Sequence, residues 1–264
     1  MVHIIGHRGG RNLWPENSLS GFRKLAQMAV DGVEFDIHLT QSGEMLVIHD
    51  PTLERTTDGR GPVADLGPGK HREICLKDSD GETIPTLEEV LAVFKDTPLE
   101  LHIELKNHAD GTPYEDLAAK AFSAVERLGL AERSILTSFQ PDVLADIRKA
   151  APGIRTLSSF DAKSAERLGL TSGLSLMRQY SDVIAVEKSL LRAKWDEITQ
   201  LVPLDQLGVW VPNETSDLEY WLAKPIRQIT TDRPDLALQT RGEACSIAAS
   251  IIPVCRGAWI TSTS

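Results

Sequence analysis

The sequence is short of cysteine, of positive charge and of long hydrophobic runs. Its three cysteines, Cys75, Cys245 and Cys255, are odd in number and show no C-x-x-C spacing, so neither a disulfide scaffold nor a zinc ribbon is expected. Lys and Arg number 28 against 38 Asp and Glu, which gives a formal net charge of −10. This charge disfavours duplex nucleic acid or an anionic membrane as a partner, because both bind basic surfaces. A small phosphate ligand stays allowed, since a bound metal or a few cations reverse the sign inside one cleft.

The longest apolar stretch, residues 247–259, is interrupted by Pro253 and Arg256 and is too short to span a bilayer. No membrane insertion is therefore expected. The first residues show neither a basic segment nor a long apolar one, so we expect no secretory signal and a cytoplasmic location. Residues 243–264 are expected to form the end of a helix and a C-terminal tail, with residues 261–264 mobile.

The sequence does have the composition of a folded globular chain. Of its 264 residues, 41% are hydrophobic and 25% are charged, which is enough to build a full core. No stretch rich in Gly, Ser or Pro divides the chain, so residues 1–264 are expected to form a single domain.

Short β-rich runs alternate with segments of helical periodicity along most of the chain. One helical segment begins at Thr86 with Glu89 three residues later, which is a capping-box pattern. Repeating units of about 33 residues predict a (β/α)₈ TIM barrel, with an open doubly wound sheet as the alternative. The eight expected strands are residues 2–6, 33–39, 100–106, 134–139, 155–159, 182–187, 207–211 and 228–231.

One further β-rich run, residues 44–49, breaks this alternation. Four residues separate it from the strand at 33–39, too few for a parallel crossover, so the two runs are expected to form an antiparallel hairpin. The polar, Gly-rich stretch that follows extends the insertion to about residue 85, over one face of the barrel.

Residues that could carry chemistry cluster at the ends of the first strands, where (β/α)₈ barrels have their active sites. Glu34 and Asp36 share one face of a strand, and so do Glu104 and Lys106, because alternate strand residues point the same way. Three carboxylates brought together resist burial unless a cation compensates them. We therefore expect a hard divalent cation, Mg²⁺ or Ca²⁺. The alternative is a set of polar barrel residues joined by a Glu104–Lys106 ion pair.

His7 follows the first strand and His49 follows the hairpin strand, so both are expected at the same mouth, on either side of the carboxylates. Imidazoles suit a general acid and a general base near neutral pH. Arg8 offers a planar fork for phosphate, and Gly9 and Gly10 let an anion approach the backbone. This set favours phosphoryl transfer over acyl transfer, and the sequence has no G-x-S-x-G, H-E-x-x-H or G-x-x-x-x-G-K-[ST] motif.

These residues stand in motifs that resemble the glycerophosphodiester phosphodiesterase family. The opening His7-Arg8-Gly9, followed after five residues by Pro15-Glu16-Asn17-Ser18, is similar to its HRG…PENT signature, with Ser18 in the place of threonine. The resemblance runs from residue 3 to about residue 235. Further motifs follow in the family's order: VEFD at 33–36, VIHDP at 47–51, LERTT at 53–57, IPTL at 84–87, IELK at 103–106, SF at 138–139, WVPN at 210–213 and TDRP at 231–234.

The resemblance implies a barrel that hydrolyses a small glycerophosphodiester-like substrate with the help of a divalent metal. The products would be an alcohol and a phosphomonoester, which is sn-glycerol 3-phosphate for the usual family substrate. The implied residues are Glu34, Asp36 and Glu104 for the metal, His7 and His49 for acid–base chemistry, Arg8 and Lys106 for the phosphate, and Trp210 for the pocket wall.

One departure from the family pattern leaves the substrate open. Family members commonly carry an aromatic segment before the IPTL motif, whereas residues 66–77 contain Lys70, His71, Arg72 and Lys77 and no other aromatic ring. Such a pocket suits a more hydroxylated alcohol, so a sugar phosphodiester of the agrocinopine type is an alternative substrate, unless this loop is solvated surface.

Two further alternatives change the class of protein. One is a non-catalytic barrel that binds a phosphodiester, and the other is a phospholipase acting at membranes. The acidic charge and the lack of a basic amphipathic helix speak against the phospholipase. We expect a small-molecule partner and no nucleic acid, and the chain is compatible with a homo-oligomer.

Overall fold

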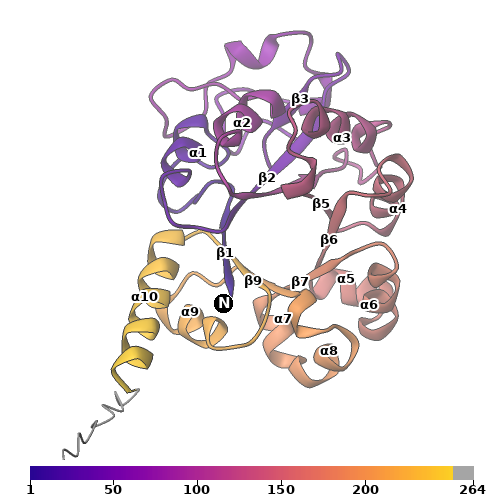
Figure 1. Cartoon of the computed structure of the whole chain (residues 1–264). Helices are drawn as coiled ribbons and strands as arrows, with labels where there is room; N and C mark the ends of the chain where they lie inside the picture. The colour runs from indigo at the N-terminus through magenta and orange to yellow at the C-terminus, as the bar shows by residue number, and fades with distance from the viewer. Residues whose placement is uncertain (252–264) are drawn as a thin grey trace, which may run out of the picture.

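The computed structural model describes the backbone of residues 1–251 and the side chains of residues 1–242 (Figure 1). At its centre eight parallel strands form a ring in the order β1-β9-β8-β7-β6-β5-β4-β2, closed by the pairing of β1 with β2. This closure confirms the (β/α)₈ barrel and excludes the open sheet. The strands are β1 His3–His7, β2 Gly32–Leu39, β4 Glu100–Leu105, β5 Ser134–Ser138, β6 Arg155–Phe160, β7 Val183–Glu187, β8 Leu207–Trp210 and β9 Gln228–Thr231.

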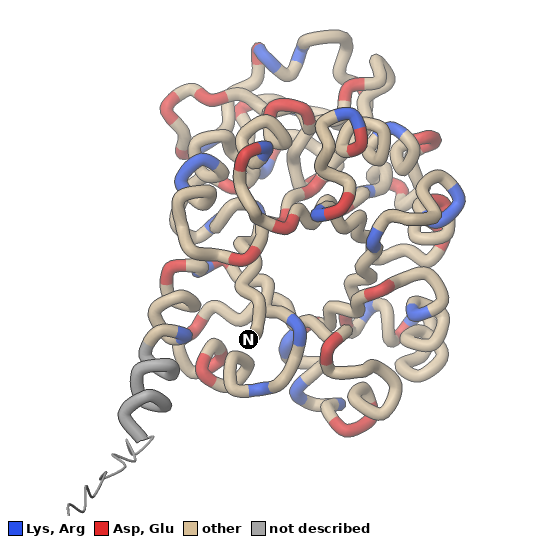
Figure 2. Tube along the Cα trace, in the orientation of Figure 1, with Lys and Arg blue, Asp and Glu red and all other residues tan. Residues whose placement is uncertain are grey.

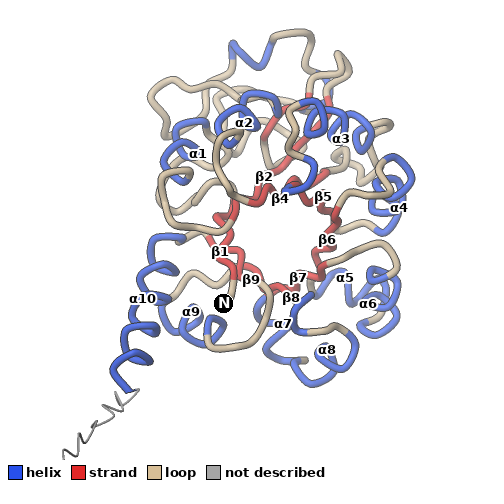
Figure 3. Tube along the Cα trace, viewed as in Figure 1, coloured by secondary structure: helices blue, strands red, loops and turns tan. Residues whose placement is uncertain are grey.

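The helices form an outer ring around the strands (Figure 3). The Thr86 hydroxyl accepts from the Glu89 amide, and the Glu89 carboxylate accepts from the Thr86 amide, so the predicted capping box is confirmed. The helices are α1 Leu19–Leu25, α2 Leu87–Phe94, α3 Leu117–Arg127, α4 Pro141–Ala150, α5 Ala162–Leu168, α6 Leu170–Arg178, α7 Lys188–Ala193, α8 Trp195–Leu201, α9 Thr215–Leu222 and α10 Pro234–Ile251, with short 3₁₀ turns η3 Ala131–Arg133 and η4 Leu204–Gln206.

The backbone of residues 243–251 continues α10, whereas residues 252–264, including the end expected to be mobile, lie outside the described residues. In the described part of the chain, none of the helices combines the length and the apolar character needed to cross a bilayer. Acidic and basic positions are interspersed around the outer ring in Figure 2.

The predicted hairpin is present. Strand β3, Met45–Val47, pairs antiparallel with β2 and lies outside the ring. The segment after it contains the 3₁₀ turns η1 Val63–Asp65 and η2 Lys70–Glu73. This insertion is more than a polar loop, because it has a small core of its own, made of Leu46, Ile48, Leu53, Val63, Leu76 and Ile84.

The main core lies between the barrel strands and the helices. Phe22 of α1 is fully buried, and its ring packs edge-on against Phe35 of β2 and Phe94 of α2, with centroids 5.7 and 5.8 Å away. Gly6 of β1 lets α1 approach closely, since a Cβ at this position would lie 2.6 Å from Leu25. This packing fixes the strand ends that carry the site.

A partly buried ionic network holds the opposite end of the barrel. Glu100, the first residue of β4, accepts hydrogen bonds from Arg155 at 2.6 Å and from Arg227 at 2.8 Å, and His102 Nε2 lies 3.4 Å away. Burial would raise the pKa of Glu100, but the hydrogen bonds from His102 and Arg227 lower it far below its usual value. The carboxylate therefore stabilises the folded chain in its ionised form.

Replacing Glu100 by Gln should lower the free energy of unfolding at pH 7 by about 3 kcal/mol, because two arginines lose their carboxylate. A carboxyl group with a lowered folded-state pKa stabilises above the unfolded value of about 4.3, and that contribution is lost as the pH falls. Urea denaturation of Glu100→Gln and the parent chain should therefore differ less at pH 3.5 than at pH 7. An equal difference at both pH values would contradict this account.

Candidate active site

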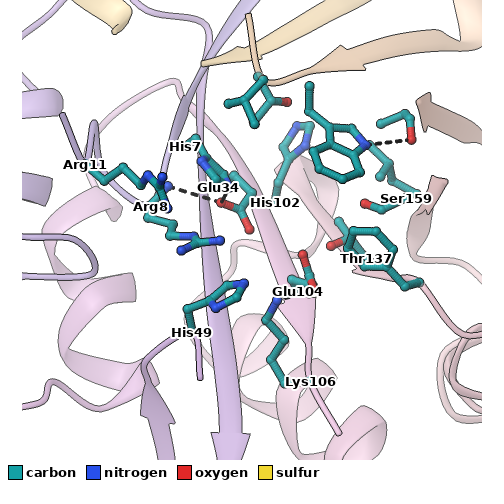
Figure 4. A pocket seen from close by; sticks show the side chains of 16 residues that line it. His7, Arg8, Arg11, Glu34, His49, His102, Glu104, Lys106, Thr137 and Ser159 are labelled. Carbon is teal, nitrogen blue, oxygen red and sulfur yellow. Dashed lines mark hydrogen bonds and ion pairs between the residues drawn. The ribbon is translucent and has the colours of Figure 1, made fainter. Parts of the chain in front are cut away.

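One cavity gathers most of the residues singled out from the sequence. It has a volume of about 270 Å³ and lies at the C-terminal ends of the barrel strands (Figure 4). Asp36 is 1% exposed and does not line the cavity itself. The other predicted residues all line it: His7, Arg8, Glu34, His49, Glu104, Lys106 and Trp210.

A tight turn after β1 places Arg8 in this cavity. Arg8, Gly9 and Gly10 all have positive φ angles, of 49°, 79° and 89°, and a Cβ on Gly9 would lie 3.0 Å from the ring of Phe22. The turn points the Arg8 amide at Glu34 Oε2, 3.1 Å away. The Gly10 amide donates to the His7 carbonyl at 2.9 Å, so it serves the turn and is not free for the anion that the sequence suggested.

The three carboxylates come together because of the sheet register. Asp36 of β2 lies directly opposite Glu104 of β4, and Glu34 is two residues before Asp36 on the same face. Oxygen atoms of the three side chains lie within 4.8 Å of one another. Lys106 lies 2.9 Å from Asp36 Oδ1 and also pairs with Glu104, so the ion pair weighed as an alternative to a metal site coexists with the cluster.

The cluster carries more negative than positive charge, because three carboxylates face two cations, Arg8 and Lys106. Burial would raise the pKa of Asp36, but Lys106 and Arg8 lower it well below its usual value. Burial, followed by repulsion from Asp36 and Glu104, raises the pKa of Glu34 well above its usual value. Among the described residues, the buried Glu34 Oε1 has no hydrogen-bond partner. These oxygen donors fit a hard divalent cation, which would compensate the excess charge.

His7 is held by a carboxylate that our sequence reasoning did not assign to the site. Its Nδ1 lies 2.5 Å from Asp232 Oδ1, while its Nε2 faces Glu34 Oε2 at 3.7 Å. Asn213 donates to Asp232 Oδ2 at 2.8 Å and accepts from the Asp232 amide at 2.9 Å. Burial lowers the pKa of His7 despite this partner. The sequence signal for these two residues was the TDRP and WVPN motifs, which gave no role for either.

His49 is held in a similar way, by its neighbour in the sequence. Its Nδ1 lies 2.6 Å from Asp50 Oδ1, and Arg55 Nε lies 2.5 Å from Asp50 Oδ2. Arg55 also donates to Glu16, and Arg8 donates to the same Glu16 at 3.2 Å, so alternating charges connect His49 to Arg8. Burial lowers the pKa of His49 to about 4, which leaves the imidazole neutral near pH 7.

The opposite wall of the cavity is apolar and aromatic. Trp210, at the end of β8, donates from Nε1 to the Ala185 carbonyl at 3.0 Å. Phe139 packs edge-on against Trp210 with centroids 5.5 Å apart. Thr137 and Ser159 also line the cavity and lie across it from Arg8 (Figure 4). The cavity therefore has a charged side, from β1 to β4, and an apolar side, from β5 to β8.

Comparison with known proteins identifies the relatives of this chain. The model of the Glycerophosphoryl diester phosphodiesterase family matches residues 7–236. A glycerophosphodiester phosphodiesterase from Caldanaerobacter subterraneus is 30% identical over 243 residues, which cover 88% of this chain and 94% of that protein. Human glycerophosphodiester phosphodiesterase 1 is 32% identical over 160 residues, which cover 56% of this chain and 46% of that protein.

Solved structures share the fold. An Agrobacterium tumefaciens structure that carries the name of this enzyme family has a TM-score of 0.85 at 28% identity and covers 93% of this chain and 99% of that chain. An Oleispira antarctica phosphodiesterase in complex with the product sn-glycerol-3-phosphate has a TM-score of 0.74 at 21% identity, over 90% of this chain and 96% of that chain, and shows the fold alone. The chain belongs to the glycerophosphoryl diester phosphodiesterase family of phosphoric diester hydrolases.

Proposed function

We propose that this chain hydrolyses small glycerophosphodiesters to an alcohol and sn-glycerol 3-phosphate. The observation that carries the proposal is one cavity in which His7 and His49, each oriented by an aspartate, flank three clustered carboxylates. The names of the relatives support the substrate, and so does the product held by the Oleispira antarctica structure.

The divalent metal would be held by Glu34, Asp36 and Glu104. When bound, Mg²⁺ or Ca²⁺ would polarise a phosphoryl oxygen as a Lewis acid. Arg8 and Lys106 place their cationic groups beside this cluster and would hold the phosphate, with the Arg8 guanidinium suited to two hydrogen bonds at once. Their positive charge would stabilise the negative charge that develops on the phosphoryl oxygens.

The two histidines would move the protons. One imidazole takes the proton of the attacking hydroxyl as a new P–O bond forms, and the other donates a proton to the alcohol oxygen as its P–O bond breaks. The attacking hydroxyl comes from water or from a neighbouring hydroxyl of the glycerol. In the second route, attack by the neighbouring glycerol hydroxyl releases the alcohol and forms a cyclic phosphate, which water then opens. Both routes therefore consume one water. Asp232 and Asp50 fix which ring nitrogen of each histidine faces the cavity.

Trp210 and Phe139 would pack against the glycerol part of the substrate and keep water away from the reacting phosphate. The choice between Mg²⁺ and Ca²⁺, the cytoplasmic location and the extent of the single domain over residues 1–264 stay predictions.

Dialysis against a chelator should abolish hydrolysis of glycerophosphocholine, and Mg²⁺ or Ca²⁺ should restore it. Replacing Glu34 by Gln should weaken metal binding in isothermal titration, because one of the three clustered carboxylates is lost. Glu88→Gln, at an exposed position of α2, is the matched control and should bind metal like the parent chain. Full activity of the parent chain in the chelator would refute the metal role.

Replacing His7 or His49 by Ala should lower kcat by roughly 10²–10⁴-fold, the usual range for losing a general acid or base. His3→Ala, at the other end of β1, removes a histidine outside the cavity and should keep kcat. Steady-state kinetics on folded variants, checked by circular dichroism, provide the measurement. An unchanged kcat for either cavity variant would remove that histidine from the mechanism.

Asp232 is a positioning residue, so Asp232→Asn should lower kcat by roughly 10²–10⁴-fold while KM changes little, as expected when a histidine loses its orienting carboxylate. Asp235→Asn provides the matched control, because Asp235 pairs with Arg233 and does not line the cavity. A rise in KM with kcat unchanged would instead make Asp232 a substrate-binding residue.

A further inference from the structure

A second cavity adjoins the first. It has a volume of about 440 Å³ and lies between the turn after β1 and the inserted segment. Arg11 lines both cavities, so the two meet at this side chain. The other residues of its lining that matter here are Trp14, Arg55, Lys77 and Asp78.

The position of this cavity suits one of the two arms of a phosphodiester. In Figure 4, Arg8 and Arg11 lie on one side of the first cavity, and Thr137 and Ser159 lie on the other side. The aromatic residues Phe139 and Trp210 also line this cavity. A phosphate held by Arg8 therefore has the aromatic wall on one side and the second cavity on the other. An in-line displacement needs such an arrangement, because the leaving oxygen departs away from the attacking oxygen.

We propose that the second cavity binds the leaving alcohol of the phosphodiester, and that its lining selects an uncharged polyol over a cationic alcohol. The proposal rests on the proposed function, since it assigns the second arm of the same substrate.

The charged side chains that line the cavity determine which alcohol it prefers. Arg55 is compensated by Glu16 and by Asp50, and Arg11 lies 3.2 Å from Asp232 Oδ1. Lys77 differs from these arginines, because its ammonium donates to the main-chain carbonyls of residues 54 and 55. Among the described residues, no carboxylate forms an ion pair with it. Arg11, Arg55 and Lys77 line the cavity together with Glu16 and Asp78, so the lining holds one positive charge in excess. An excess positive charge repels a quaternary ammonium group, whereas N–H donors match the oxygens of a polyol.

The aromatic lining points the same way. Quaternary ammonium groups are recognised by several aromatic faces, and within the described part of the chain Trp14 is the one aromatic residue that lines this cavity. Lys24 Nζ already lies 5.7 Å from the centroid of the Trp14 ring. The ring therefore has a cationic partner from the chain itself, and the described residues form no aromatic cage for a ligand cation here.

Lys77 differs in its surroundings from the other basic groups of residues 66–77. Lys70 pairs with Glu73, and Arg72 pairs with Glu89 at 2.7 Å. His71 is 3% exposed, and its Nδ1 lies 3.5 Å from Glu44 Oε1. Lys77 alone of these four side chains lines the second cavity, so the hydroxyl-binding role considered for the whole loop falls on this residue.

The test compares glycerophosphoglycerol with glycerophosphocholine, which share the phosphodiester and differ in the leaving alcohol. The parent chain should show a kcat/KM about fivefold higher for glycerophosphoglycerol, in line with one screened charge contact. Lys77→Gln retains donors for the two carbonyls and removes the charge, so it should bring the two kcat/KM values together. The change should come through KM of the choline substrate.

Lys70→Gln is the matched control, because it removes the same charge from the same inserted segment outside the cavity, and its preference should equal that of the parent chain. Asp78→Asn keeps the size of a lining residue and removes a negative charge, so it should increase the preference for the polyol. Asp78 has a positive φ of 57°, which asparagine tolerates, so this variant tests the proposal should Lys77→Gln fail to fold.

The outcomes separate the two proposals. If the parent chain hydrolyses neither substrate, the proposed function fails. If it hydrolyses both and Lys77→Gln and Asp78→Asn leave the preference unchanged, the function stands and the leaving-group site is overturned. A parent chain that prefers glycerophosphocholine would also overturn it.

Discussion

Mutual repulsion among three buried carboxylates organises this protein. The parallel register sets Asp36 opposite Glu104, and the two-residue period of β2 adds Glu34 on the same face. Such a set cannot stay ionised in a cavity without positive charge close by. Arg8 and Lys106 supply two positive charges against three carboxylates, and burial, followed by repulsion from Asp36 and Glu104, raises the pKa of Glu34 well above its usual value. A divalent cation would offset the remaining negative charge, which supports the proposed metal site.

A chain of ion pairs connects Arg8, beside the carboxylate cluster, to the rim of the barrel and to the inserted segment. The Arg8 guanidinium contacts Glu16, which pairs with Arg55, and Arg55 holds Asp50 against His49. The insertion therefore fixes His49 and Arg8, the proposed phosphate-binding arginine, relative to each other. Its small apolar core explains how a segment with little regular structure can do this, because a packed core limits the motion of the side chains it carries.

Features set by neighbouring residues could be predicted from the sequence, and features set by closure of the chain could not. The capping box at Thr86 and the common face of Glu34 and Asp36 follow from spacings of three and two residues, and the structure shows both. His7 and Asp232 lie 225 residues apart and meet only because β9 pairs with β1. No local pattern reports such a contact. The core of the insertion was missed for a related reason, since short apolar residues scattered among polar ones show no periodicity.

The acidic net charge and the anionic substrate are reconciled by where the charges lie. Many of the acidic residues are interspersed with basic ones around the outer ring, where solvent screens them (Figure 2). The cavity brings Glu34 and Glu104, two of the proposed metal ligands, together with the cationic side chains of Arg8, Lys106 and Arg11, beside which the phosphate would bind. The first half of the barrel thus supplies charge and the second half supplies apolar surface. A phosphodiester entering this asymmetric cavity would have its phosphate drawn to one side, which fixes the direction in which its two alcohol arms point.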